Sequence, residues 1–203
     1  MTDLLDGYRR FRAEVWPAER SRYEALAARG QTPQTLVIAC SDSRVDPATV
    51  FGAGPGELFV IRNVAGLVPP YRPDAGYHGT SAALEFAVRV LRVSRIVVLG
   101  HAQCGGVRAM VEGAPETAQD FVRPWMSLAA EQLGPMPGMP VDLPTLFHYE
   151  EQVVRVSLAN LRSFPWIAEA EAGGRLELIG MRFAIHTGVL DQLEGDRFEP
   201  VGG

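Results

Sequence analysis

Uninterrupted apolar runs and one amphipathic segment define the middle of the chain. Four short runs, rich in β-branched residues, occupy residues 35–39, 58–61, 95–99 and 176–179. Continuous runs of this kind are typical of strands buried on both faces of a parallel sheet. Between the second and third runs, apolar residues recur at spacings of three and four over 80–91, which predicts a helix. We therefore expect an α/β fold: a mostly parallel central sheet of four to five strands flanked by helices.

The N-terminal segment carries an apolar stripe of its own. Over residues 3–28 the apolar positions again lie three and four apart, which predicts a helix with a break or kink at Pro17. This helix precedes the first strand and has no obvious place inside a compact core. We expect residues 1–29 to form a helical arm that packs on a partner subunit.

The remaining pattern completes one domain. Helices are predicted around residues 121–133 and 144–162, and a loop punctuated by proline and glycine joins them at 134–140. The length of 203 residues is enough for one sizeable core, and the chain has no internal repeat. We predict a single domain over residues 1–203, with these two helices as an insertion.

Composition and charge narrow the classes of partner. Apolar residues make up 47% of the chain and charged residues 21%, as in soluble globular proteins. The net charge of −5 argues against nucleic acid, because phosphates are neutralised by clustered Lys and Arg. The N-terminus lacks the apolar core of a signal peptide, and no stretch approaches the roughly 20 apolar residues of a membrane span. We expect a cytoplasmic protein that has no membrane partner.

Three candidate metal ligands follow predicted strands. Cys40 comes directly after the first run, His101 follows the third, and Cys104 lies three residues later. Functional groups of open α/β sheets gather at the carboxyl ends of the strands, so these side chains converge if the two strands are neighbours. Two thiolates and one imidazole suit a catalytic zinc ion with an open fourth position. Taken alone, each cysteine is more often a small core residue.

Two charged residues that follow Cys40 favour a metal site over the alternative that the cysteines are only core residues. Asp42 and Arg44 stand at the mouth of a buried strand, where polar groups cost free energy unless they are paired. A carboxylate and a guanidinium two residues apart can form a bidentate pair. Such a pair could also be a structural ion pair that closes a turn.

The order and spacing of these motifs resemble those of the β-class carbonic anhydrases. Cys-x-Asp-Ser-Arg is followed by His-x-x-Cys-Gly, and the likeness runs from about Gly30 to Gly188. It includes residues 55–57, residues 59–65 and the pattern at 79–87. The resemblance implies reversible hydration of carbon dioxide to bicarbonate and a proton by attack of zinc-bound hydroxide. It also implies one Zn²⁺ per subunit and a homodimer or a higher homo-oligomer.

The resemblance assigns roles to individual residues. Cys40, His101 and Cys104 would bind zinc, and Asp42 and Arg44 would form the catalytic dyad. The positions that match substrate-binding positions of the plant-like subgroup, some of which act across the subunit interface, are Gln31, Phe59, Val64, Phe86 and Gly105.

The sequence also departs from the family pattern. Phe86 stands where the plant-like subgroup has tyrosine, so a polar contact is lost there. Another subgroup has a regulatory bicarbonate site built on a tryptophan and a tyrosine, and the corresponding residues here are Val37 and Phe183. We therefore expect no inhibition by bicarbonate at fixed pH.

Two thiolate ligands should weaken the acidification of water by zinc, so we expect hydration activity to rise above neutral pH.

Two alternative functions stay open. One is a carbonyl sulfide or carbon disulfide hydrolase on the same scaffold, in which pocket width would decide the substrate. The other is a non-catalytic zinc-binding protein, which would carry the metal but show no hydration activity. Among the remaining histidines, His78 is a weaker candidate, as a proton shuttle.

Overall fold

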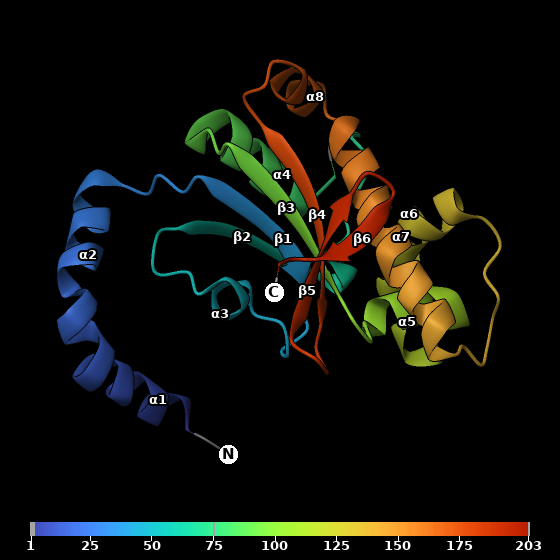
Figure 1. Ribbon diagram of the computed structural model, residues 1–203, viewed down its shortest axis with the longest axis horizontal. Helices are drawn as coiled ribbons and strands as arrows, with labels where there is room; N and C mark the ends of the chain where they lie inside the picture. The colour runs from blue at the N-terminus through green and yellow to red at the C-terminus, as the bar shows by residue number, and fades with distance from the viewer. Residues whose placement is uncertain (1–2, 75, 203) are drawn as a thin grey trace.

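The computed structural model describes residues 3–74 and 76–202, and a six-stranded sheet forms its centre (Figure 1). The order of strands across the sheet is β2-β1-β3-β4-β5-β6. The strands β2, β1, β3 and β4 run parallel to one another, whereas β5 pairs antiparallel with β4 and β6 pairs antiparallel with β5. The strands are β1 (Thr35–Cys40), β2 (Leu58–Asn63), β3 (Arg95–His101), β4 (Glu177–Ala184), β5 (Val189–Glu194) and β6 (Arg197–Pro200).

The α/β fold class is confirmed, but the sheet has six strands rather than four to five. The four predicted runs correspond to β1 to β4. Strands β5 and β6 were not predicted, and their residues are all half-buried or exposed. Antiparallel strands at a sheet edge keep one side in solvent, so they lack the continuous apolar run that marks a buried parallel strand.

The helices follow the predicted amphipathic segments. Residues 80–91 lie in α4 and the π-helical stretch η3, and the two predicted C-terminal helices correspond to α6 and α7. Within residues 3–74 and 76–202, no helix has the length and apolar character that crossing a bilayer requires. The helical elements are α1 (Leu4–Arg10), η1 (Phe11–Val15), α2 (Trp16–Arg29), α3 (Pro47–Phe51), η2 (Val64–Gly66), α4 (Gly79–Glu85), η3 (Phe86–Leu91), α5 (Gly105–Glu112), η4 (Glu116–Ala118), α6 (Val122–Leu133), α7 (Leu143–Arg162) and α8 (Pro165–Ala172).

Helices cover both faces of the sheet, but unequally. On one face, Leu36 and Ile38 pack with apolar side chains of α4, α7 and α8. On the other face, Val37 and Ala39 pack against the short helix α3. Because successive side chains of a strand point to opposite faces, burial on both sides explains the uninterrupted apolar runs of β1 and β3. At the carboxyl end of the sheet, α5, α6 and α7 enclose a third apolar cluster, which includes Cys40 and Cys104.

The N-terminal helices form an arm that extends away from the sheet (Figure 1). Pro17, at which the sequence predicts a break or kink, lies in the first turn of α2 directly after the π-helical stretch η1. The irregular turn accommodates the missing proline N–H, so the helix continues. No residue of α1, η1 or α2 is buried. The arm is tied to its own chain where the Arg22 guanidinium lies 2.6 Å from the Glu57 carboxylate.

Candidate metal centre

Two neighbouring strands bring the three candidate ligands together. Cys40 is the last residue of β1, His101 is the last residue of β3, and Cys104 directly precedes α5, at its N-cap position. Because β1 and β3 pair in parallel, their carboxyl ends meet at one edge of the sheet. The two Sγ atoms are 3.9 Å apart, and one ligand atom from each of the three residues lies within 4.8 Å of the others. All three side chains are buried.

The donor set fits a zinc ion. The Nδ1 atom of His101 lies 2.9 Å from the Ala102 carbonyl oxygen, and since a carbonyl only accepts, Nδ1 is the donor. That bond leaves the lone pair of Nε2 free, and this buried atom has no hydrogen-bond partner among the described residues. A buried imidazole nitrogen of this kind beside two thiols is what a Cys₂His zinc site requires.

The two thiols share one negative charge. The hydrogen bond from Cys104 lowers the pKa of Cys40 to about 4, although burial opposes this shift. The same bond, together with burial, raises the pKa of Cys104. Burial favours neutral His101, but the Cys40 thiolate and the Ala102 carbonyl outweigh it and raise the pKa of the imidazole. A dication would favour the thiolate form of both cysteines, since thiolates are the form that binds metal.

Asp42 and Arg44 form a bidentate ion pair beside this cluster. The Nε and Nη2 atoms of Arg44 lie 2.9 and 2.7 Å from the two carboxylate oxygens of Asp42, and the Arg44 backbone N–H donates to Oδ1. These hydrogen bonds from Arg44 hold the pKa of Asp42 well below its usual range. Oδ2 of Asp42 lies 3.9 Å from Nε2 of His101, so an ionised carboxylate is held next to the cluster.

Arg62 and Glu150 were missed by the sequence analysis as residues of the site. Arg62 donates to the carbonyl oxygens of Cys40 and Asp42 at 2.9 and 2.6 Å, and so braces the loop after β1. Glu150 accepts the backbone N–H of Cys104 at 3.2 Å. A weak signal for Glu150 was present, because it is an acidic residue on the apolar face of a predicted helix.

The five candidate substrate-binding residues divide into two groups, and the first lies near the cluster. Gly105 is the first residue of α5, directly after Cys104. Val64 follows β2, and its Cγ1 lies 2.7 Å from the place that a Cβ on Gly106 would occupy. Val64 and Gly105 therefore belong to the same end of the sheet as Cys40.

The second group lies near the opposite end of the sheet. Phe59 pairs with Leu36 near the start of β1, four residues before the end of β2, which is about 13 Å along a strand. Its ring packs on Phe86 with centroids 6.0 Å apart. Gln31 precedes β1 and is exposed. Within one chain, the structure does not bring Gln31, Phe59 or Phe86 to the metal cluster.

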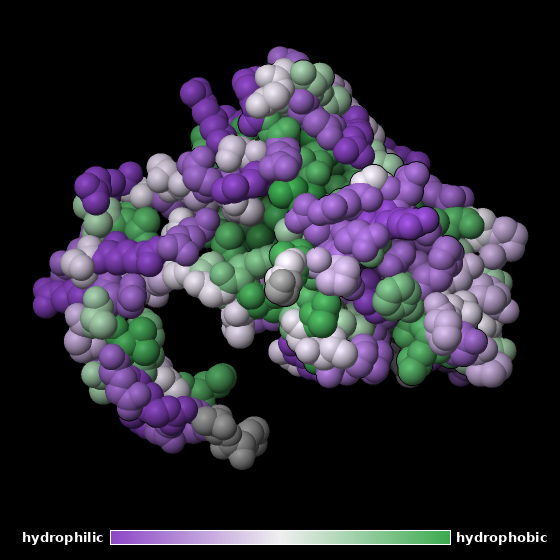
Figure 2. All heavy atoms as spheres, in the orientation of Figure 1, coloured by the Kyte–Doolittle hydropathy of each residue, from purple (hydrophilic) through white to green (hydrophobic). Residues whose placement is uncertain are grey.

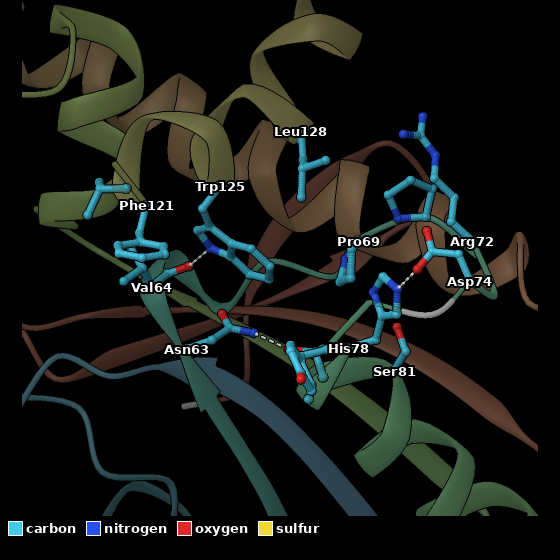
Figure 3. Close-up of a pocket in the computed structure, with 15 residues that line it drawn as sticks. Asn63, Val64, Pro69, Arg72, Asp74, His78, Ser81, Phe121, Trp125 and Leu128 are labelled. Atoms are coloured by element: carbon cyan, nitrogen blue, oxygen red, sulfur yellow. Dashed lines mark hydrogen bonds and ion pairs between the residues drawn. The ribbon is translucent and has the colours of Figure 1, made fainter. Parts of the chain in front are cut away.

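A separate cavity of about 630 Å³ lies beside the site, between η2, the start of α4 and α6 (Figure 3). Trp125 lines it and donates from Nε1 to the Val64 carbonyl oxygen at 2.9 Å. At the other side of the cavity, Nε2 of His78 lies 2.6 Å from Oδ1 of Asp74, within hydrogen-bond distance. None of the three candidate ligands lines this cavity, whose wall includes Asn63 and Val64.

Comparisons with known proteins identify the family of this chain. A family model described as carbonic anhydrase matches residues 35–190. A carbonic anhydrase from Pseudomonas aeruginosa is 40% identical over 197 residues, covering 96% of this chain and 88% of that protein. Beta carbonic anhydrase 3 from Arabidopsis thaliana is 32% identical over 199 residues, covering 95% of this chain and 76% of that protein. The solved β-carbonic anhydrase CcaA is similar with a TM-score of 0.84 at 28% identity, covering 98% of this chain and 91% of that one. The resemblance is confirmed: the chain belongs to the carbonic anhydrase family, in its β class.

Proposed function

We propose that this protein catalyses the reversible hydration of carbon dioxide to bicarbonate and a proton, with one zinc ion per subunit held by Cys40, His101 and Cys104. The observation that carries the proposal is the buried cluster of two thiols and an unpaired imidazole nitrogen, with one atom from each within 4.8 Å of the others. When bound, zinc lowers the pKa of water and so supplies hydroxide near neutral pH.

Asp42 and Arg44 act as the catalytic dyad in this proposal. An ionised carboxylate only accepts hydrogen bonds, so Asp42 can hold the hydrogen of the attacking oxygen and turn a lone pair toward carbon dioxide. Arg44 occupies both carboxylate oxygens and keeps Asp42 ionised and oriented.

The substrate is small and apolar, and its product carries a charge. Val64 offers an apolar wall, and the Gly105 backbone N–H, at the first turn of α5, can donate to developing negative charge. We propose that Phe59 and Phe86 complete the apolar wall and that Gln31 donates a hydrogen bond to the substrate. These three residues are too far from the cluster of their own chain to do so there.

In a homodimer or a larger homo-oligomer, these three residues could act at the metal cluster of a neighbouring subunit instead of their own. The arm leaves large apolar side chains in solvent, with Leu4 89% and Tyr8 59% exposed. Figure 2 shows apolar atoms on the inner side of the arm and on the part of the sheet that faces it. Both are surfaces that a second copy of the chain could cover. We infer that the second copy brings Gln31, Phe59 and Phe86 to the site of its partner.

The proposal also places the enzyme in the cytoplasm. Both ligand cysteines must stay as thiolates, and the chain's two cysteines are free and buried. Reducing compartments keep such thiols from forming disulfides.

The test compares substrates on zinc-loaded protein at alkaline pH. Stopped-flow hydration of carbon dioxide should be faster than hydrolysis of carbonyl sulfide or carbon disulfide measured on the same sample. Preference for either sulfur compound would indicate the hydrolase alternative. Zinc-loaded protein with no activity toward any of the three would leave only the zinc-binding alternative.

A further inference from the structure

A buried ion pair lies behind the metal cluster. Glu150 on α7 and Arg182 on β4 are each only 3% exposed. The Nη2 and Nε atoms of Arg182 lie 2.9 and 3.2 Å from the same oxygen, Oε2 of Glu150. The guanidinium also stacks 3.8 Å from the Phe147 ring and lies 3.7 Å from Asp191. Buried ion pairs are often no more stabilising than apolar residues of similar volume, so stability alone does not explain this one.

The second oxygen of Glu150 faces the metal cluster. Oε1 accepts the backbone N–H of Cys104 at 3.2 Å. That N–H belongs to the peptide group between Gln103 and Cys104, and the carbonyl oxygen of the same peptide accepts Nη2 of Arg44 at 3.1 Å. One peptide group is therefore held at both ends by charged side chains, by Arg44 from the solvent side and by Glu150 from the buried side.

The turn that contains this peptide needs support. Gln103 has φ of +55°, in the left-handed region that residues with a Cβ adopt only at a cost in free energy. This turn reverses the chain after β3, so that the Cys104 sulfur returns to 3.9 Å from the Cys40 sulfur. A peptide that could rotate here would move one candidate ligand away from the other two.

We propose that Glu150, anchored by Arg182, is a positioning residue of the metal centre: it holds the Gln103–Cys104 peptide and thereby sets the position of the Cys104 sulfur. This inference rests on the proposed role of Cys104 as a zinc ligand. The hydrogen-bond acceptor on Glu150 is the part that acts on the site, and Arg182 keeps the carboxylate in place.

Two matched double variants isolate that acceptor. Glu150→Gln/Arg182→Met removes both charges but keeps an oxygen for the Cys104 N–H. Glu150→Leu/Arg182→Met removes the same charges and leaves the N–H without an acceptor. Asp191 loses the same partner in both, so the comparison cancels that effect. The measurements are the zinc dissociation constant, from competition with a chromophoric chelator, and the thiolate-to-metal absorption bands of the cobalt(II)-loaded protein.

The glutamine double variant keeps the acceptor but lacks the Arg182 anchor, so its zinc affinity should lie between those of the wild type and the leucine double variant, with a cobalt spectrum close to that of the wild type. The leucine double variant should bind zinc about 10–100-fold more weakly, as expected for loss of an outer partner, and its bands should shift. If the leucine variant does not fold, Glu150→Asp can be compared with the wild type instead. It keeps the charge but withdraws the acceptor from the Cys104 N–H by one methylene group. Its zinc affinity should also fall and its bands should also shift.

Equal zinc affinities and cobalt spectra in the acceptor-bearing and acceptor-deficient proteins would overturn the inference. Wild-type protein and Cys104→Ser serve as references. Wild-type protein that binds zinc no better than Cys104→Ser would instead contradict the proposed metal site itself.

Discussion

Arg44 and Asp42 are joined by two side-chain hydrogen bonds of 2.9 and 2.7 Å, and the same guanidinium reaches the Gln103 carbonyl oxygen at 3.1 Å. Arg44 therefore contacts both the carboxylate proposed to orient the nucleophile and the loop that carries Cys104. The dyad and the ligand loop are one connected structure, in which the charge of Asp42 and the position of the loop depend on the same side chain.

Replacing Asp42 by asparagine should separate metal binding from catalysis. We expect Asp42→Asn to keep a full complement of zinc and to lose about 10–100-fold in hydration activity, because a partner that orients the reacting group is removed. Metal content and stopped-flow rates on the same samples measure both effects. Asp46→Asn is the control, since Asp46 caps α3 by accepting the Thr49 N–H, which asparagine can also do. A fully active Asp42→Asn protein would rule out the proposed role of the carboxylate.

Hydration activity should rise as the pH increases above neutral. With zinc bound, Cys40 and Cys104 would both be thiolates, and their two negative charges would disfavour a further negative charge at the site. Asp42 does not cause the rise, because hydrogen bonds from Arg44 hold its pKa well below the usual range and keep it ionised throughout. A pH–rate profile that is already flat at its maximum by about pH 6 would contradict this expectation.

The ion pair between Asp42 and Arg44 should contribute to the free energy of unfolding in a pH-dependent way. The pKa of Asp42 is lower in the folded protein than the value of about 3.9 expected in the unfolded chain. The contribution is therefore complete at neutral pH and is lost as the pH falls below about 4 toward the lower folded-state value. Arg44→Met should lower the urea midpoint at pH 7, and the difference from wild type should shrink in acid. A difference that grows on acidification would contradict this sign.

Subunit mixing tests whether Gln31 acts in the site of its partner. Asp42→Asn and Gln31→Ala proteins should each be poorly active alone. In a mixed dimer, the Gln31→Ala subunit keeps its own Asp42 and receives Gln31 from the other chain. Random exchange makes half of the dimers mixed, each with one intact site, so activity should recover to about a quarter of the wild-type level. No gain on mixing would show that Gln31 does not act across the interface.

Gly106 lies where α5 contacts η2, and a methyl group there has no room. A Cβ would lie 2.7 Å from Val64 Cγ1 and 3.3 Å from the Ala65 backbone nitrogen. Gly106→Ala should lower the free energy of unfolding by about 1–3 kcal/mol, which exceeds the gain in helix propensity. Chemical denaturation measures the change. Gly105→Ala is the control for stability, because its Cβ would meet nothing within 4 Å. Equal losses in both variants would contradict the steric argument.

The sequence predicted those parts of the fold that leave a local pattern. The central strands β1 and β3 are buried on both faces, and β2 and β4, which are only partly buried, also carry short apolar runs. The parallel part of the sheet and its carboxyl end could therefore be predicted. The hairpin of β5 and β6 is half exposed and leaves no such run. Cys40 and His101 could be proposed as neighbours because each ends a predicted strand.

Other parts of the site depend on long-range contacts that no local pattern encodes. Glu150 and Arg182 are 32 residues apart and meet only because α7 packs on β4. Arg62 reaches the Cys40 carbonyl across the β1–β2 pair. The displacement of Gln31 from the cluster is likewise visible only once the strand direction is known.

The most direct test of the central claim is a zinc titration of carbon dioxide hydration. Protein stripped of metal is reloaded stepwise, and activity is followed by stopped flow in wild-type and Cys104→Ser samples. The account predicts that wild-type activity rises linearly and reaches a plateau at one zinc per subunit, while Cys104→Ser neither retains zinc nor gains activity. Wild-type protein that takes up one zinc per subunit without hydrating carbon dioxide, or activity that is independent of zinc, would contradict it.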